Sequence, residues 1–357
     1  MPVTEKTNSF YNDNHLNPAG TEGFAFLEFT GPDLNHLSML FKNLGFTHAG
    51  NHKKKNVELW RQRNCNFLIN KEPNSFSEDF AKKHGPSVSG MAFQVKNAKA
   101  AYKHVCECDA KPYEKKTSDW YEDGFVIYGI GDNLLYFIED EKFYAKHFDL
   151  VNESSKEHSF GLLYIDHVTN NVFRGNMNKW ATFYEKLFNF HEIRYFDIKG
   201  KMTGLFSRAM TSPCGKIRIP INESSDDKSQ IAEFVRTLNG EGIQHIALAT
   251  NTIYETIEGM KKKGTKFLFT PDTYYKMINK RLPYHTEPLE RMQKNKILID
   301  GSPEKDGGIL LQIFTENCIG PVFFEIIERK GDEGFGEGNF QALFDSIELD
   351  QIERGVI

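Results

Sequence analysis

The fold of this chain is decided by the stretch GIQHIALAT (residues 242–250). Apolar residues alternate with other residues along it, as they do in a β-strand with one buried face. His245 stands out, because an imidazole among aliphatic neighbours is costly unless it is hydrogen-bonded or bound. A single buried histidine is more often a hydrogen-bonded core residue than a ligand, so His245 alone indicates little.

Two other strand-like stretches carry the same anomaly. His167 lies within LYIDHV (163–168), and Glu325 lies within VFFEII (322–327). Two histidines and one carboxylate are the ligand set of the facial triad that holds Fe(II) and leaves coordination positions open. The three residues therefore indicate a metal site, provided that the fold brings their strands together.

The chain repeats the order strand, helix, several strands, which predicts a duplicated α+β scaffold. Superposing the halves makes Phe29, Gly90 and Tyr136 the counterparts of His167, His245 and Glu325. None of the three upstream residues binds a metal as His or Glu does, tyrosine being a weak exception. The second copy is therefore predicted to be the active one. Two unrelated α+β domains are the alternative, because such periodicities also recur by chance.

A length of 357 residues predicts about two domains. The stretch 142–157 is mostly polar, and we place a linker there, between domains at residues 1–155 and 156–357. The net charge of -5 gives no reason to expect nucleic acid or a membrane as a partner. The absence of an apolar leader or a membrane-length apolar run, with five scattered cysteines, favours a reduced, cytoplasmic protein.

Five motifs together carry a resemblance to a known family. They are RIPINE (218–223), GIQHIALAT (242–250), GILLQIFT (308–315), FFEIIERKG (323–331) and GFGEGNFQALF (334–344). From about Gly23 to its C-terminal helix, the chain resembles the 4-hydroxyphenylpyruvate dioxygenase family of the vicinal-oxygen-chelate superfamily. The resemblance implies four βαβββ modules, paired into one open barrel per domain. It also implies iron in the second domain only, and a C-terminal capping helix.

The resemblance also implies the residues of the site. The implied Fe(II) ligands are His167, His245 and Glu325. The implied catalytic polar residues are Ser207, Asn222, Gln244 and Gln312. The implied substrate-binding residues are Pro220, Gln230, Phe314, Phe323, Phe335 and Phe340. The activity implied is conversion of 4-hydroxyphenylpyruvate and O2 to homogentisate and CO2, in tyrosine and phenylalanine catabolism. The protein is expected to hold one Fe(II) per subunit, without an organic cofactor, and to form a homo-oligomer (a dimer or tetramer).

The C-terminal segment has the pattern of an amphipathic helix, with Asn339 as its N-cap. The apolar face of this predicted helix carries Phe340, Leu343, Phe344 and Ile347. The resemblance implies that the helix covers the pocket and gates it, with the glycine-rich stretch 331–338 as the hinge. A packed core helix is the alternative.

Three other functions share parts of this pattern. 4-Hydroxymandelate synthase uses the same scaffold but oxidises the benzylic carbon, and the RIPINE stretch and Phe335 favour ring oxidation instead. Extradiol catechol dioxygenases need a further acid/base histidine, for which His285 is the loose candidate. A metal-free binding module would not need the three ligands, which are all present.

Overall fold

The computed structural model of the protein describes residues 16–140, 142–151, 159–199, 204–339 and 341–343. The upstream elements are β1 (Thr21–Thr30), α1 (Leu34–Asn43), β2 (Thr47–His52), β3 (Val57–Gln62), β4 (Cys65–Asn70), α2 (Phe76–His84), β5 (Ser87–Val95), α3 (Ala98–Glu107), β6 (Val126–Tyr128), the 3-10 helix η1 (Ile130–Asp132), β7 (Leu134–Ile138), α4 (Lys142–His147) and β8 (Phe148–Leu150).

The downstream elements follow the same plan with larger insertions. They are β9 (Leu162–Val172), α5 (Met177–Phe188), β10 (His191–Lys199), β11 (Gly204–Thr211), β12 (Arg218–Ser224), α6 (Gln230–Thr237), β13 (Gly242–Thr250), α7 (Ile253–Lys262), α8 (Asp272–Arg281), α9 (Leu289–Asn295), β14 (Leu298–Gly301), β15 (Ile309–Phe314) and β16 (Phe323–Lys330).

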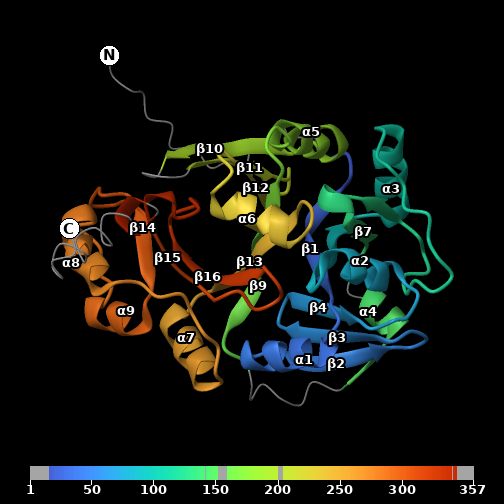
Figure 1. Ribbon diagram of the computed structural model, residues 1–357, viewed down its shortest axis with the longest axis horizontal. Helices are drawn as coiled ribbons and strands as arrows, with labels where there is room; N and C mark the ends of the chain where they lie inside the picture. The colour runs from blue at the N-terminus through green and yellow to red at the C-terminus, as the bar shows by residue number, and fades with distance from the viewer. Residues whose placement is uncertain (1–15, 141, 152–158, 200–203, 340, 344–357) are drawn as a thin grey trace.

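These strands form two curled sheets, each with eight strands among the described residues (Figure 1). The upstream order is β6-β7-β5-β1-β4-β3-β2-β8, and the downstream order is β10-β11-β12-β9-β13-β16-β15-β14. In each sheet the first strands of the two modules pair antiparallel, and each pairs in parallel with the last strand of its own module. The predicted α+β class, with paired modules in open barrels, is confirmed.

Local sequence sets the ends of the elements, as α1 illustrates. The Asp33 carboxylate accepts hydrogen bonds from the backbone N–H groups of Asn35 and His36, so Asp33 is the N-cap of α1. Gly45, with a φ of 86°, follows the last turn, and the N–H of Phe46 donates to the carbonyl of Phe41. This pattern satisfies carbonyl groups at the helix end and favours glycine at the left-handed position.

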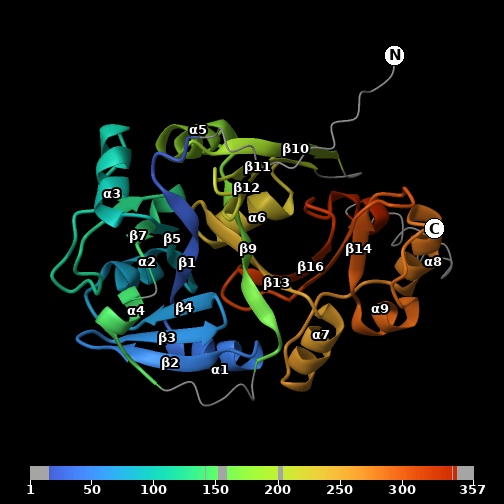
Figure 2. The ribbon, with the colours of Figure 1, turned by 180° about the vertical axis from the view of Figure 1, so that it is seen from behind.

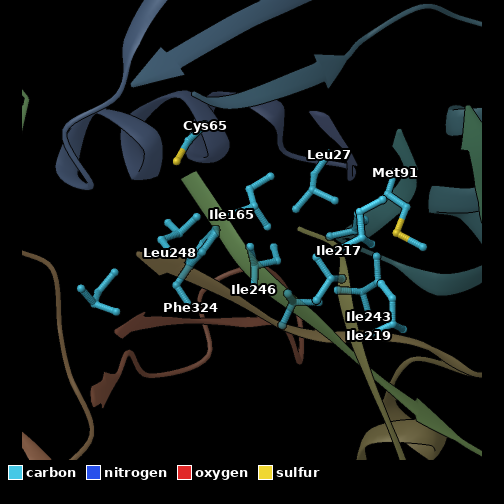
Figure 3. Close-up of a cluster of buried hydrophobic side chains, with 14 of the residues drawn as sticks. Leu27, Cys65, Met91, Ile165, Ile217, Ile219, Ile243, Ile246, Leu248 and Phe324 are labelled. Carbon is cyan, nitrogen blue, oxygen red and sulfur yellow. The ribbon is translucent and has the colours of Figure 1, made fainter. Parts of the chain in front are cut away.

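The backs of the two sheets share one apolar core. Ile246 and Leu248 alternate with His245 and Ala247 along β13, so they point to the opposite face of the sheet. Figure 3 shows them beside Leu27 of the upstream sheet, with residues from both halves in one buried cluster. Seen from behind, β9 lies next to β1 and β4, while α8 and α9 lie on the side away from the upstream sheet (Figure 2). Packing between the sheets therefore leaves the His245 face free for the site.

The strand register corrects one predicted counterpart. Ala247 is paired with His167, and its upstream equivalent Ala92 is paired with Phe26. Phe26, not Phe29, therefore occupies the position of His167. Phe29 lies on the other face of the sheet, where its ring packs against α1. The counterparts of His245 and Glu325 are Gly90 and Tyr136, as predicted.

The predicted linker at 142–157 is wrong in its first part. Residues 142–147 form α4, and β8 then pairs with β2 at the edge of the upstream sheet. Buried Phe143, Tyr144 and Phe148 hold this segment to the domain despite its charged residues. The predicted boundary between residues 155 and 156 lies outside the described residues. None of the described helices is long and apolar enough to span a membrane.

Candidate metal centre

The three predicted ligands converge on the inner face of the downstream sheet. His167, His245 and Glu325 come from the neighbouring strands β9, β13 and β16, and their ligand atoms lie within 4.8 Å of one another. Glu325 Oε2 is 3.2 Å from His167 Nε2 and 3.5 Å from His245 Nε2. The side chains of His167 and Glu325 are almost fully buried, and that of His245 is 13% exposed. Among the described residues, this is the one cluster of three or more such side chains with this spacing.

Two β-bulges aim the histidines at this point. Asp166 is the extra residue of β9 against β13, and Gln244 is the extra residue of β13 against β9. A bulge lets successive side chains turn to the same side of a sheet. Asp166 Oδ1 therefore lies 2.8 Å from Nδ1 of His167, and Gln244 Oε1 lies 3.0 Å from Nδ1 of His245. With Nδ1 as the donor, each ring presents its Nε2 lone pair to the site.

The charges of the cluster fit a bound cation. Burial by itself would raise the pKa of Glu325, but His167 and His245 outweigh it and lower the pKa to about 2. Burial lowers the pKa of His245, whereas for His167 Glu325 and Asp166 outweigh burial and raise the pKa. Oε1 of Glu325 is buried without a hydrogen-bond partner. An unpartnered carboxylate oxygen beside two imidazole nitrogens is a donor set that suits a transition metal.

Aromatic rings surround the histidines. The Phe323 ring stacks on His245, with centroids 5.0 Å apart and planes at 20°. The Phe314 ring is T-shaped to His245, with centroids 6.3 Å apart, and the Phe335 ring is T-shaped to His167 at 5.2 Å. The structure therefore brings three predicted substrate-binding residues to the triad. Phe340, the fourth predicted aromatic residue, lies outside the described residues.

Other predicted polar residues extend along the same face of β9, β12 and β11. Asn171 is four residues from His167 on β9, and Asn222 is paired with it, with 3.3 Å between Asn222 Nδ2 and Asn171 Oδ1. Ser207 is paired with Asn222, and the buried Pro220 is two residues earlier on β12. Asn171 was missed in the sequence because an asparagine near a strand end also suits a turn.

The predicted glutamines are placed differently from one another. Gln312 is buried on β15, two residues from Phe314, and its Oε1 has no hydrogen-bond partner. The backbone at Gly336 packs against the Gln312 amide and leaves no room for a side chain there. Gln244 contacts His245 directly, so it orients this ring. Gln230 is exposed in the first turn of α6, and its role stays a prediction.

Sequence reasoning missed the charged residues behind His167. Asp166 is buried, but Arg329 outweighs burial and holds the pKa of Asp166 well below its usual range. Arg218 also contacts this carboxylate. The available signals were Asp166, next to a ligand candidate, and Arg329, near the end of FFEIIERKG. Nothing in the sequence pairs these two residues.

The start of the C-terminal segment corrects the predicted cap. Residues 337–339 are already helical, so Asn339 is not the N-cap. Its side chain is buried, and Asn339 Oδ1 accepts a hydrogen bond of 2.6 Å from the Tyr274 hydroxyl. Leu343 is helical and partly buried against the core. Phe344 and Ile347, with most of the predicted capping helix, lie outside the described residues.

His285 does not join the triad. Its Nε2 lies 2.9 Å from the side-chain oxygen of Asn279, and its Nδ1 accepts from the N–H of Glu287. These contacts hold the ring between α8 and α9. The further acid/base histidine of an extradiol enzyme is therefore not supplied by His285.

Comparisons with known proteins agree with this geometry. Residues 15–150 match the family described as "Hydroxyphenylpyruvate dioxygenase, HPPD, N-terminal", and residues 164–277 match the "Glyoxalase/Bleomycin resistance protein/Dioxygenase superfamily". The chain is 53% identical to 4-hydroxyphenylpyruvate dioxygenase of Pseudomonas aeruginosa, over 96% of this chain and 97% of that protein. It is 54% identical to a protein named hemolysin VllY of Vibrio vulnificus, over 96% and 98%.

A solved structure shares the fold at lower identity. It is a mutant of 4-hydroxymandelate synthase from Streptomyces coelicolor, with a TM-score of 0.77 and 21% identity over 93% of this chain and 99% of that one. At this identity the likeness concerns the fold alone.

Proposed function

This chain belongs to the 4-hydroxyphenylpyruvate dioxygenase family, and we propose that it binds one Fe(II) through His167, His245 and Glu325. The enzyme converts 4-hydroxyphenylpyruvate and O2 to homogentisate and CO2, by oxidative decarboxylation, ring hydroxylation and migration of the side chain. The observation that carries the metal assignment is the convergence of three ligand atoms from three neighbouring strands. The unpartnered Oε1 of Glu325 supports it.

Bound Fe(II) supplies the activation of O2 that this chemistry needs, and the keto acid supplies electrons. The protein positions the substrate and excludes water from the site. Phe314, Phe323 and Phe335 form apolar walls that exclude water and hold an aromatic ring in a defined orientation. Asp166 and Gln244 keep the Nε2 atoms of the two histidines turned towards the site.

Polar side chains on the same face suit the polar ends of the substrate. Oε1 of Gln312 is buried without a partner and is free to accept a hydrogen bond from a phenol hydroxyl, which supports Gln312 as a substrate contact. Ser207 and Asn222 lie further along the face and provide a hydroxyl and an amide. Buried groups of this kind select a hydroxylated ring over a plain one, because the plain ring leaves them unpaired.

Anaerobic reconstitution tests the proposal. The purified protein is loaded with Fe(II), mixed with 4-hydroxyphenylpyruvate and then exposed to O2, and the products are identified by mass spectrometry and chromatography. We expect one iron per subunit and homogentisate as the product. His285→Ala is a matched control, because it removes a histidine of the same domain outside the triad, and it should keep both iron and turnover. Accumulation of 4-hydroxymandelate would contradict ring oxidation, and failure to retain iron would contradict the metal assignment.

A further inference from the structure

A buried ion-pair cluster lies directly behind His167. The Asp166 side chain is fully buried, and its Oδ1 is 2.8 Å from His167 Nδ1. Arg329 donates to both carboxylate oxygens, through Nη2 at 2.8 Å and Nε at 2.9 Å. Arg218 Nη1 adds a fourth contact at 3.2 Å. One carboxylate therefore serves a metal ligand and two arginines, and the paired bonds to Arg329 are the geometry that fixes a guanidinium most firmly.

Both arginines continue to the segment that follows β16. Nη1 of Arg329 donates to the carbonyl oxygens of Asp332, at 3.1 Å, and Gly334, at 2.6 Å. Nη2 of Arg218 donates to the Glu333 carboxylate at 2.6 Å. Residues 332–334 are thereby attached to β12 and β16, and two of the three are attached through main-chain carbonyl groups.

Phe335 completes the connection. It follows the attached residues directly, and its ring lies 5.2 Å from the His167 ring and 5.7 Å from the Arg329 guanidinium carbon. The arginine that holds the segment is thus in contact with the aromatic residue that the segment presents to the site. Contacts therefore run from His167 to Asp166, from Asp166 to Arg329, from Arg329 to Phe335, and from Phe335 back to His167.

We propose that Asp166 is a positioning residue that couples the orientation of His167 to the seating of residues 332–335 over the metal position. This inference rests on the proposed function of the triad. A carboxylate behind a ligating histidine fixes the ring and raises its basicity. Because the same carboxylate orients Arg329, any change that frees Asp166 loosens both the ligand and the segment.

Two variants and two readouts test the coupling. Asp166→Asn keeps the size of the side chain but removes its charge, and Arg329→Lys cannot make the paired bonds while also reaching two carbonyl groups. Metal affinity is measured by titration with Co(II), followed by its absorption spectrum. The packing of the segment is measured by amide hydrogen exchange of residues 332–338 in the metal-free and the metal-loaded protein.

We expect Asp166→Asn to lower Co(II) affinity by about 10- to 100-fold and to speed exchange of the segment. Arg329→Lys should speed exchange and lower affinity in the same direction, which provides the test if Asp166→Asn does not fold. The matched control is Arg291→Lys, which breaks paired bonds to Glu258 elsewhere in the same domain and should change neither readout.

The outcomes separate this inference from the assignment of the metal centre. A wild-type protein that binds neither Fe(II) nor Co(II) would overturn both. Normal metal binding by the wild type, with unchanged affinity and exchange in both variants, would overturn the positioning role alone. Loss of affinity without faster exchange would also overturn the coupling, because His167 would then respond to Asp166 independently of the segment.

Discussion

Two β-bulges between the central strands lie at the same register positions in the upstream and the downstream sheet, but they carry different side chains. The extra residues are Ala25 and Ser89 upstream, and Asp166 and Gln244 downstream. The backbone that turns a side chain towards the centre of the sheet is therefore present twice. Only the downstream copy combines it with groups that orient a histidine. The scaffold therefore allows a His/His/Glu triad without requiring one.

The upstream inner face is filled with aromatic side chains at the positions where the downstream face carries His167, His245 and Glu325. Phe26, Gly90 and Tyr136 occupy the three ligand positions. A Cβ built on Gly90 would lie 2.7 Å from a ring carbon of Tyr136, so that ring fills the space of the missing side chain. Phe26 packs against Tyr136 and Trp120, with centroids 5.4 and 5.6 Å away. Aromatic packing turns the same half-barrel into a closed core.

A buried carboxylate is present in both sheets, but its partners differ. Glu28 of the upstream sheet accepts four hydrogen bonds within that domain. The donors are Asn70 Nδ2 at 2.7 Å, Ser77 Oγ at 2.7 Å, Trp120 Nε1 at 3.2 Å and Tyr136 OH at 2.6 Å. Glu325 of the downstream sheet keeps one oxygen without a partner. A satisfied carboxylate stabilises the fold, whereas an unsatisfied one is available to a ligand.

Substitutions at the triad positions of the downstream sheet and at the corresponding positions of the upstream sheet should give the largest contrast. His245→Ala deletes a ligand, so iron binding and turnover should fall to the background level while the protein stays folded. Tyr136→Phe changes the upstream residue that corresponds to Glu325 and should leave one iron per subunit. Metal analysis, oxygen uptake and circular dichroism measure the three properties. Retained iron and full turnover in His245→Ala would refute the ligand assignment, and iron loss in Tyr136→Phe would refute the contrast.

Replacement of the buried carboxylate of the upstream sheet should change the stability of the protein but not its iron content or turnover. Glu28→Gln replaces an acceptor by an amide whose NH2 group faces donors, so we expect a loss of about 1–3 kcal/mol in the free energy of unfolding. Urea denaturation measures the loss, and iron content and turnover per folded subunit should equal those of the wild type. An unchanged unfolding midpoint would show that the four hydrogen bonds of Glu28 do not stabilise the upstream domain.

The sequence predicted the parts of this comparison that depend on local pattern. Alternation placed His245 on the inner face, and polar residues within apolar strands identified the triad. The register of β1 was not predictable, because Phe24, Phe26 and Phe29 let the alternating pattern fit several alignments. The segment of β2, THAGNH, lacks the apolar residues that reveal a strand, although tertiary pairing makes it one.

Long-range pairs were beyond local pattern altogether. Asp166 and Arg329 lie 163 residues apart in the chain, and the contact exists only because two crossover connections bring β9 and β16 to either side of β13. The triad was recognised without this knowledge because two histidines and one carboxylate, each within an apolar strand, together match a known ligand set. The residues that orient it have ordinary types, so they became visible only from their contacts.

The smallest expected effect is on the stability of the upstream sheet at acidic pH. His52 on β2 is buried against His147, with ring centroids 6.0 Å apart, and its Nδ1 accepts from the N–H groups of Lys54 and Lys55. Burial, and then His147, lower the pKa of His52 from 6.5 to about 4. The unfolded chain therefore binds a proton at a higher pH than the folded one. Stability from this residue is complete above about pH 6.5 and is lost as the pH falls towards 4.

His52→Gln should flatten this dependence, because glutamine does not titrate. Urea unfolding midpoints measured from pH 7 to pH 4 should fall less steeply for His52→Gln than for the wild type. The control His36→Gln replaces an exposed histidine of the same domain and should follow the wild-type slope. Parallel curves for all three proteins would show that the buried pair does not take up protons on unfolding in this range. A flattened slope with unchanged iron content would place acid sensitivity in the sheet that carries no ligands, which is where the comparison puts it.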